Sequence, residues 1–137
     1  MIEVESVTHY FGPTRALDDV SFDIAANEVV GFLGLNGAGK STMLRILGGL
    51  LHPSTGRVEI GGIDAALAPA KLRASIGFLP DEPPLYRDMR VRDFLVWAAE
   101  LKGRSRKEAL AALPEALQMT QTDDVADSPI AALSYGY

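Results

Sequence analysis

The start of the chain alternates apolar and polar residues, which is the pattern of strands with one buried face. The alternation is clear in residues 2–7 (IEVESV) and again in residues 18–24 (DDVSFDI). Gly12 and Pro13 stand between the two segments and favour a turn there. The pattern therefore predicts an antiparallel β part at the start of the chain.

A different pattern begins at residue 29. Residues 29–33 (VVGFL) and 76–80 (IGFLP) are apolar without alternation, which is typical of strands buried on both faces and suits the centre of a parallel sheet. Between them, residues 41–48 and 67–75 show the helical spacing of apolar residues. Together these segments predict an α/β fold.

The last third of the chain has a helical character, with amphipathic patterns at 91–103 and 106–119. Pro114 lies inside the second pattern, and we expect a kink or a split there because proline removes a helix hydrogen bond. The change in character predicts two parts. These are a β-rich core over residues 1–90 and a helical part over residues 91–137.

The composition limits the possible partners and compartments. A length of 137 residues suffices for one domain with a hydrophobic core, and a formal net charge of −5 gives no basic field that would attract DNA or RNA. The chain has no cysteine, which excludes disulfides and thiolate metal sites. We see no secretory signal pattern and no apolar run long enough to span a bilayer, and we therefore expect a cytoplasmic protein.

A cluster of glycines lies between the apolar run at 29–33 and the first helical pattern. Residues 34–41 (GLNGAGKS) match G-x-x-x-x-G-K-[ST], and the predicted strand before and helix after are the context that this motif requires. Glycines let the backbone approach a polyphosphate, and a helix N-terminus favours negative charge. The motif predicts phosphate binding by Gly34, Asn36, Gly37, Ala38, Gly39, Lys40, Ser41 and Thr42.

Three side chains of this loop have separate expected roles. Lys40 is a point cation for the β- and γ-phosphates and the residue of the loop expected to act in catalysis. The Ser41 hydroxyl is expected to bind Mg²⁺, and the Thr42 hydroxyl lies toward the α-phosphate side. The expected ligand is therefore a nucleoside triphosphate with Mg²⁺.

The surroundings of the loop distinguish among P-loop proteins. Two predicted strands precede it, whereas kinases and Ras-like GTPases usually place it after the first strand, and neither N-K-x-D nor D-x-x-G follows it. Residues 7–24 (VTHYFGPTRALDDVSFDI), 76–95 (IGFLPDEPPLYRDMRVRDFL) and 133–137 (LSYGY) instead resemble the opening, the Q-loop region and the signature motif of ABC transporter ATP-binding subunits. The second segment is most similar to ATPases of ABC-2-type exporters. The resemblance implies a P-loop NTPase fold of the ABC type, in incomplete form, and ATP as the nucleotide.

The resemblance assigns further contacts with ATP. In the family an aromatic residue just before a glycine stacks on adenine, and by position this residue is Phe11, with Tyr10 as the alternative. Ser134 and Gly136 belong to the signature-like motif, which in the family covers ATP held by a second nucleotide-binding domain. These two residues are therefore expected to bind nucleotide across a dimer.

The chain departs from the family pattern at two positions. Asp81 stands where the family usually has a glutamine that reaches Mg²⁺ and the attacking water. Either Asp81 keeps this role in metal binding and catalysis, with a steeper Mg²⁺ dependence because carboxylates bind hard cations, or it is a solvated loop acid. Arg90 stands where the family commonly has threonine as a helix cap, and we expect Asp88 or Asp93 to compensate in part.

The function implied by the resemblance is that of an ATPase subunit that drives a membrane transporter. Its partners would be a second nucleotide-binding domain and a transmembrane permease that docks near residues 82–97, with no nucleic acid. The subunit would lie on the cytoplasmic face of the cell membrane. The alternatives are a module that binds nucleotide without hydrolysing it and a soluble ABC ATPase.

The family's acidic Walker B strand and switch histidine have no counterpart in the sequence. We expect the chain to end within the signature-like motif and to bind ATP without efficient turnover, because no acid stands in the right context to serve as a base. His9 and His52 do not fit the switch position and are expected to be solvated turn residues.

Overall fold

A computed structural model describes residues 1–134 of the chain. It divides into two compact units, Met1–Phe78 and a second unit that starts at Leu79. Residues 79–90, which the sequence placed with the β-rich core, belong to the second unit. The reason is that the carbonyls of Arg87 and Met89 accept hydrogen bonds from the N–H groups of Ala131 and Ile130, at 2.8 and 2.9 Å.

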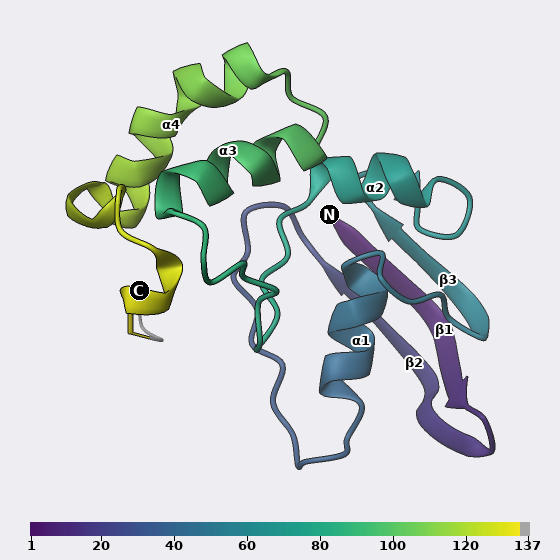
Figure 1. Cartoon of the computed structure of the whole chain (residues 1–137). Coiled ribbons are helices and arrows are strands. Elements are labelled where there is room, and N and C mark those ends of the chain that lie inside the picture. Colours follow the sequence, from purple (N-terminus) through teal and green to yellow (C-terminus); the bar gives the residue numbers. More distant parts are fainter. Residues whose placement is uncertain (135–137) are drawn as a thin grey trace. The chain divides into compact units, whose positions relative to one another are not determined.

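The first unit contains one antiparallel sheet (Figure 1). Its strands are β1 (Ile2–Phe11), β2 (Thr14–Ile24), β3 (Thr55–Ile60) and β4 (Ile63–Asp64), in the order β2-β1-β3-β4. The hairpin of β1 and β2 turns at the predicted glycine and proline, so the antiparallel β part is confirmed.

A β-bulge interrupts the regular alternation of β1. The register against both neighbouring strands shifts by one residue between Val4 and the residues that follow, and Ser6 adopts a positive φ of 46°. The Ser6 N–H donates to Ser21 Oγ at 2.8 Å, which replaces the ladder bond lost at the bulge. As a result Val4 and Val7 both point into the core.

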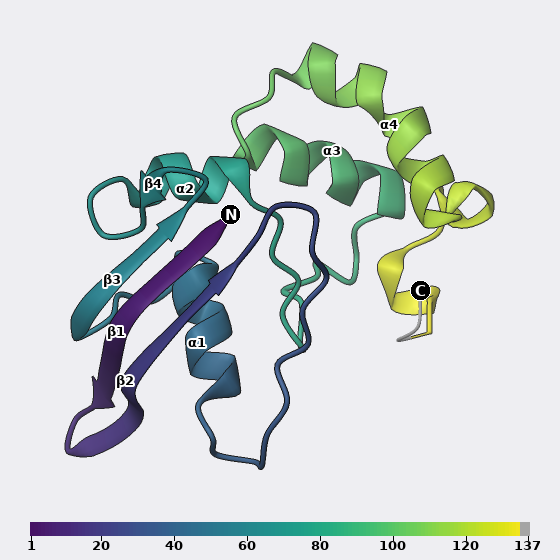
Figure 2. The ribbon, with the colours of Figure 1, turned by 180° about the vertical axis from the view of Figure 1, so that it is seen from behind.

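Helices α1 (Lys40–Leu47) and α2 (Pro69–Ser75) complete the first unit. Figure 2 shows the sheet from the other side, with α1 behind it. Met43 and Ile46 of α1 lie three residues apart on one helix face and are fully buried against the sheet. The buried core of the unit comprises Val4, Val7, Leu17, Met43, Ile46, Val58, Ala65 and Leu72.

The sequence predicts two central strands at 29–33 and 76–80, but neither segment forms a strand in the structure, so this prediction is wrong. Residues 29–33 and 76–80 have no strand assignment, and Leu33 is 94% exposed and Leu79 84%. Phe32 and Ile76 are the partly buried members of these runs that pack against the core, and the Phe32 ring lies edge-on to Phe22. A strand that is apolar on both faces needs neighbours on both edges, and no strand within the described residues pairs with either run.

The second unit is built on helices α3 (Val91–Leu101) and α4 (Arg106–Thr120), followed by the 3₁₀ turns η1 (Asp123–Val125) and η2 (Ile130–Ala132). Ser105 and Glu108 form a capping box that starts α4. Pro114 lies inside a continuous α4, so of the expected kink or split the split does not occur. Buried side chains before and after the proline, including Ala109 and Leu117, pack in one core and offset the lost hydrogen bond.

Helix α3 begins without a side-chain cap, as the Arg90 substitution predicts. Its first N–H groups are instead satisfied by the backbone, because Val91 donates to the Ser128 carbonyl at 3.1 Å and Arg92 to the Ala126 carbonyl at 3.0 Å. Two carbonyls from a segment distant in sequence thus accept these bonds, and Asp93, one of the two acids expected to compensate, lies in the first turn of the helix.

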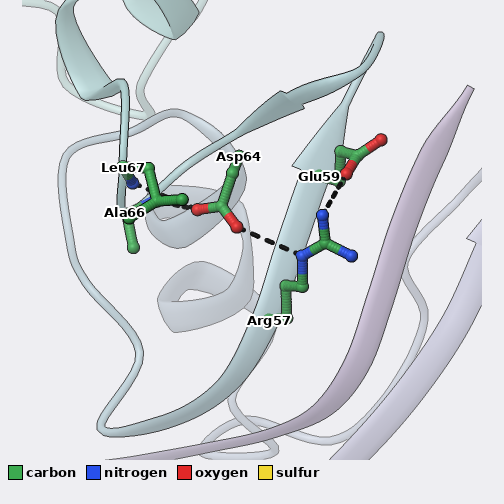
Figure 3. Close-up of polar contacts among 5 residues, drawn as sticks. All are labelled: Arg57, Glu59, Asp64, Ala66 and Leu67. Carbon is green, nitrogen blue, oxygen red and sulfur yellow. Dashed lines mark hydrogen bonds and ion pairs between the residues drawn. The ribbon is translucent and has the colours of Figure 1, made fainter.

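An exposed ionic network fixes the end of the sheet (Figure 3). The Asp64 carboxylate accepts hydrogen bonds from the N–H groups of Ala66 and Leu67. It also forms an ion pair with Arg57, whose Nε lies 3.1 Å from Asp64 Oδ2, and Arg57 forms a second ion pair with Glu59. The Leu67 N–H, the Arg57 guanidinium and the Ala66 N–H hold the pKa of Asp64 below its ordinary value of 3.8. The carboxylate thus joins the β3–β4 hairpin to the start of the next loop.

Replacing Asp64 by asparagine is expected to lower the melting temperature of the chain at neutral pH. The pKa of Asp64 is lower in the folded state than in the unfolded state. The resulting stabilisation is fully present at a pH above the unfolded-state pKa and is lost as the pH falls through the folded-state pKa. The difference between D64N and the wild type should therefore shrink in acid, below about pH 4. Thermal unfolding at several pH values measures this, with the exposed Asp23→Asn as the control. A difference that stays constant down to pH 2 would contradict the role of the carboxylate charge.

Candidate nucleotide-binding site

The glycine loop leads directly into α1, as the motif predicts. Gly39 is the residue before the helix, with a left-handed φ of 86°, and the first helical bond joins Met43 N–H to its carbonyl. Among the described residues no side chain caps α1, and its first turn carries no acid. Its first N–H groups and the positive end of the helix dipole are therefore available to an anion.

Lys40 is folded back over the loop. Its Nζ donates to the carbonyls of Gly34 and Leu35, each at 2.7 Å. These two bonds bring the ammonium group to the start of the motif, so the loop closes around a positive charge. A phosphate lying on the loop would meet this cation together with the backbone N–H groups of the α1 terminus.

Two glycines of the loop are required for different reasons. Gly37 has φ 85°, and a Cβ built on it meets no heavy atom within 4 Å, so only its backbone conformation calls for glycine. Gly39 has the same conformation, but its Cβ would lie 2.6 Å from the Ala16 carbonyl oxygen and 2.6 Å from Leu17 Cδ2. The end of the loop is therefore pressed against β2, whereas its middle is open to a ligand.

The other predicted residues of the loop lie on its accessible side. Asn36, Ala38 and Ser41 are exposed, and Thr42 is half-buried. No cluster of three or more His, Asp or Glu side chains that would bind a metal on its own is found within residues 1–134. The accessible Ser41 hydroxyl fits Mg²⁺ that is held mainly by phosphate oxygens, which is how proteins commonly bind this ion.

The aromatic residues at the end of β1 lie on different sides of the strand. The Phe11 ring contacts the ring of His9 edge-on, with centroids 4.6 Å apart, so both side chains are on one face. His9 pairs with Leu17, whose side chain reaches the Gly39 backbone. Tyr10 lies between them in sequence, and the alternation of side chains along a strand puts it on the opposite face. Phe11 is thus on the face that meets the glycine loop, and it is half-exposed.

His9 itself is buried, which corrects the expectation of a solvated turn residue. His52 is exposed in the loop before β3, as expected. Neither the burial of His9 nor its contact with Phe11 is visible in the sequence, because both depend on the bulged register of β1.

The remaining site residues lie in or beyond the second unit. Asp81 is exposed in the segment before α3 and has an interaction partner of its own. Ser134 is exposed at the end of the described residues, and Gly136 lies outside them. The loop and Phe11 belong to the first unit.

The second unit also contains an apolar pocket of about 780 Å³ that the sequence did not reveal. Its walls come from the segment before α3, from α3 itself, and from the last residue of α4 and the chain after it, with Leu85, Phe94 and Ile130 among its lining residues. Beside it, Tyr86 packs edge-on against Trp97 at 4.9 Å. Leu85 and Tyr86 are both largely exposed.

Comparison with known proteins identifies the family. The family model described as "ABC transporter" matches residues 17–137. An ABC transporter ATP-binding protein of Methanocaldococcus jannaschii is 39% identical over 135 residues, covering 98% of this chain and 47% of the relative. The sulfate/thiosulfate import ATP-binding protein CysA of Thermosynechococcus vestitus is 36% identical, covering 98% of this chain and 40% of the relative.

Solved structures agree with this result. The fold matches an ATP-binding subunit of an ABC transporter with a TM-score of 0.84 and 32% identity, over 99% of this chain and 57% of that one. It matches the ATP-binding cassette MJ0796, a dimer in a post-hydrolysis state bound to ADP and Pi, with a TM-score of 0.83 and 28% identity, over 98% and 63% of the two chains.

The chain therefore belongs to the ABC transporter family and has the α/β, P-loop NTPase fold of its ATP-binding domains. It spans less than half the length of the two curated relatives named above. Within residues 1–134, no helix combines the length and the hydropathy needed to cross a membrane.

Alanine substitutions at Gly37 and Gly39 distinguish the cost of backbone strain from the cost of a steric clash. Gly39→Ala is expected to destabilise the chain by about 2–4 kcal/mol, because the left-handed conformation and the collision with β2 both oppose the new Cβ. Gly37→Ala has the same conformation without the collision and should cost about 1–2 kcal/mol. Denaturant unfolding of both variants measures the difference, and equal losses would show that the approach to β2 is not tight.

Proposed function

We propose that this chain binds Mg-ATP and forms part of the ATP-binding subunit of an ABC transporter, which couples ATP binding and hydrolysis to transport through a membrane permease. The observation that supports this most directly is the open glycine loop that leads into α1. Its N–H groups, the helix dipole and the Lys40 ammonium all favour a polyphosphate at one place.

The roles of the chain's residues in this site follow from their positions. Backbone N–H groups of the glycine loop and of the first turn of α1 hold the phosphates, and Lys40 neutralises the charge of the β- and γ-phosphates. Ser41 contributes its hydroxyl to Mg²⁺, which supplies charge neutralisation between the phosphate oxygens. Phe11 offers a half-exposed ring on the loop-facing side of β1 and stacks on the adenine.

Hydrolysis requires more than these residues provide. Lys40 stabilises charge but does not activate water. Within residues 1–134 the first turn of α1 carries no acid, and no cluster of three or more His, Asp or Glu side chains that could hold a metal is found. These 137 residues are therefore expected to bind ATP without efficient turnover. The same chemistry is the basis of the alternative, a module that binds nucleotide without hydrolysing it.

The proposed partners are a second nucleotide-binding domain and a permease. In the dimer, Ser134 and Gly136 of one chain approach the phosphates held by the loop of the other. The permease docks on the segment 82–97. There the apolar pocket, which Arg87 helps to line, and the exposed ring of Tyr86 together offer an apolar surface. Through this contact the chain lies on the cytoplasmic face of the membrane.

Replacing Lys40 by alanine tests the phosphate site. The loss of a charge-assisted contact with phosphate is expected to weaken Mg-ATP binding about 10- to 100-fold. Isothermal titration with Mg-ATP measures the affinity, and Lys71→Ala on α2 is the control because it removes an exposed lysine of the same unit. Unchanged affinity in K40A would refute the proposed site.

Replacing Asp81 by glutamine tests whether this acid takes part in metal binding. If it does, ATP affinity of the wild-type chain rises steeply with Mg²⁺ concentration, since the carboxylate repels phosphate until the cation is present. The glutamine variant should show a flatter dependence. Titrations with ATP at several Mg²⁺ concentrations decide between the two readings, and identical curves would make Asp81 a solvated loop acid.

A further inference from the structure

His9 is an unusual residue in the core of the first unit. Its side chain is only 6% exposed, yet neither ring nitrogen has a hydrogen-bond partner among residues 1–134. Most buried polar groups in proteins are hydrogen-bonded, and an unpaired one opposes folding. A leucine would fill a similar space without this cost, so packing in the core alone does not account for a ring at this position.

The surroundings of His9 connect it to the nucleotide site. Its ring meets the Phe11 ring at 4.6 Å with an interplanar angle of 76°, which is a favourable edge-to-face arrangement. Across the sheet it pairs with Leu17, and Leu17 is held between the core and the backbone of Gly39. The imidazole is thus buried beside a strand neighbour that is itself buried, and its ring contacts the half-exposed Phe11.

We infer that His9 is a positioning residue for Phe11, a role that rests on the proposed contact between Phe11 and adenine. A half-exposed phenylalanine at the end of a strand has several rotamers, and ordering such a side chain on binding costs free energy. The buried imidazole ring holds Phe11 in one orientation before the nucleotide arrives. His9 does not touch the nucleotide, and its effect reaches the base through Phe11.

The inference predicts an effect on the base but not on the phosphates. His9→Ala in the 137-residue chain should weaken Mg-ATP binding about two- to tenfold, which corresponds to the loss of one aromatic pair. Binding of inorganic tripolyphosphate with Mg²⁺ should stay within about twofold, because the loop and Lys40 bind it without Phe11. His52→Ala, which removes the exposed histidine, is the matched control and should change neither affinity.

Two further variants separate positioning from a general effect on folding. His9→Phe keeps a flat ring beside Phe11 and should bind Mg-ATP within about twofold of the wild type, whereas His9→Leu fills the space without a ring and should bind it as weakly as His9→Ala. If His9→Ala does not fold, the comparison of His9→Phe with His9→Leu still tests whether a ring at residue 9 positions Phe11. Equal affinities in the phenylalanine and leucine variants would overturn the inference.

A double-mutant cycle completes the test. Phe11→Ala should weaken Mg-ATP binding about tenfold while sparing tripolyphosphate, and adding His9→Ala to it should have no further effect. If Phe11→Ala leaves ATP binding unchanged, the adenine contact of the proposed function is wrong and the inference fails with it. If Phe11→Ala acts as expected but His9→Ala is neutral, or weakens both ligands equally, the inference alone is overturned.

Discussion

The close approach of Gly39 to β2 is the contact on which the rest of the first unit depends. It brings the end of the phosphate loop against the Ala16 carbonyl and the Leu17 side chain, with no room for a Cβ. Because α1 starts at the next residue, the same contact places Met43 and Ile46 over the sheet. The hydrophobic core and the glycine loop are therefore built on one tight backbone approach, which only glycine allows.

Features set by neighbouring residues could be predicted from the sequence. The loop and the start of α1 follow from the spacing of glycines, Lys40 and Ser41, because the motif encodes its own backbone conformation and helix start. The β1–β2 hairpin follows from alternation and a glycine–proline turn. In each case the physical cause lies within a few residues, so the pattern is sufficient.

Features set by distant residues could not be predicted. The apolar run at 29–33 has the composition of a central strand, but strand formation requires neighbours that no part of residues 1–134 supplies. Pro114 removes a hydrogen bond from α4, but the burial of helix residues before and after it, such as Ala109 and Leu117, outweighs this loss. The boundary between the units lies before Leu79 and not after residue 90. The carbonyls of Arg87 and Met89 accept hydrogen bonds from residues more than forty positions later, which local sequence does not reveal.

The bulge at Ser6 has a consequence for the chemistry of the nucleotide site. Without it, strict alternation from Val4 would turn the even-numbered residues of β1, Tyr10 among them, toward the core. The extra residue reverses the phase of the strand, so that His9 is buried instead and the half-exposed Phe11 lies against its ring. A backbone irregularity in the middle of the strand thus decides which of the two aromatic rings at its end shares a face with His9.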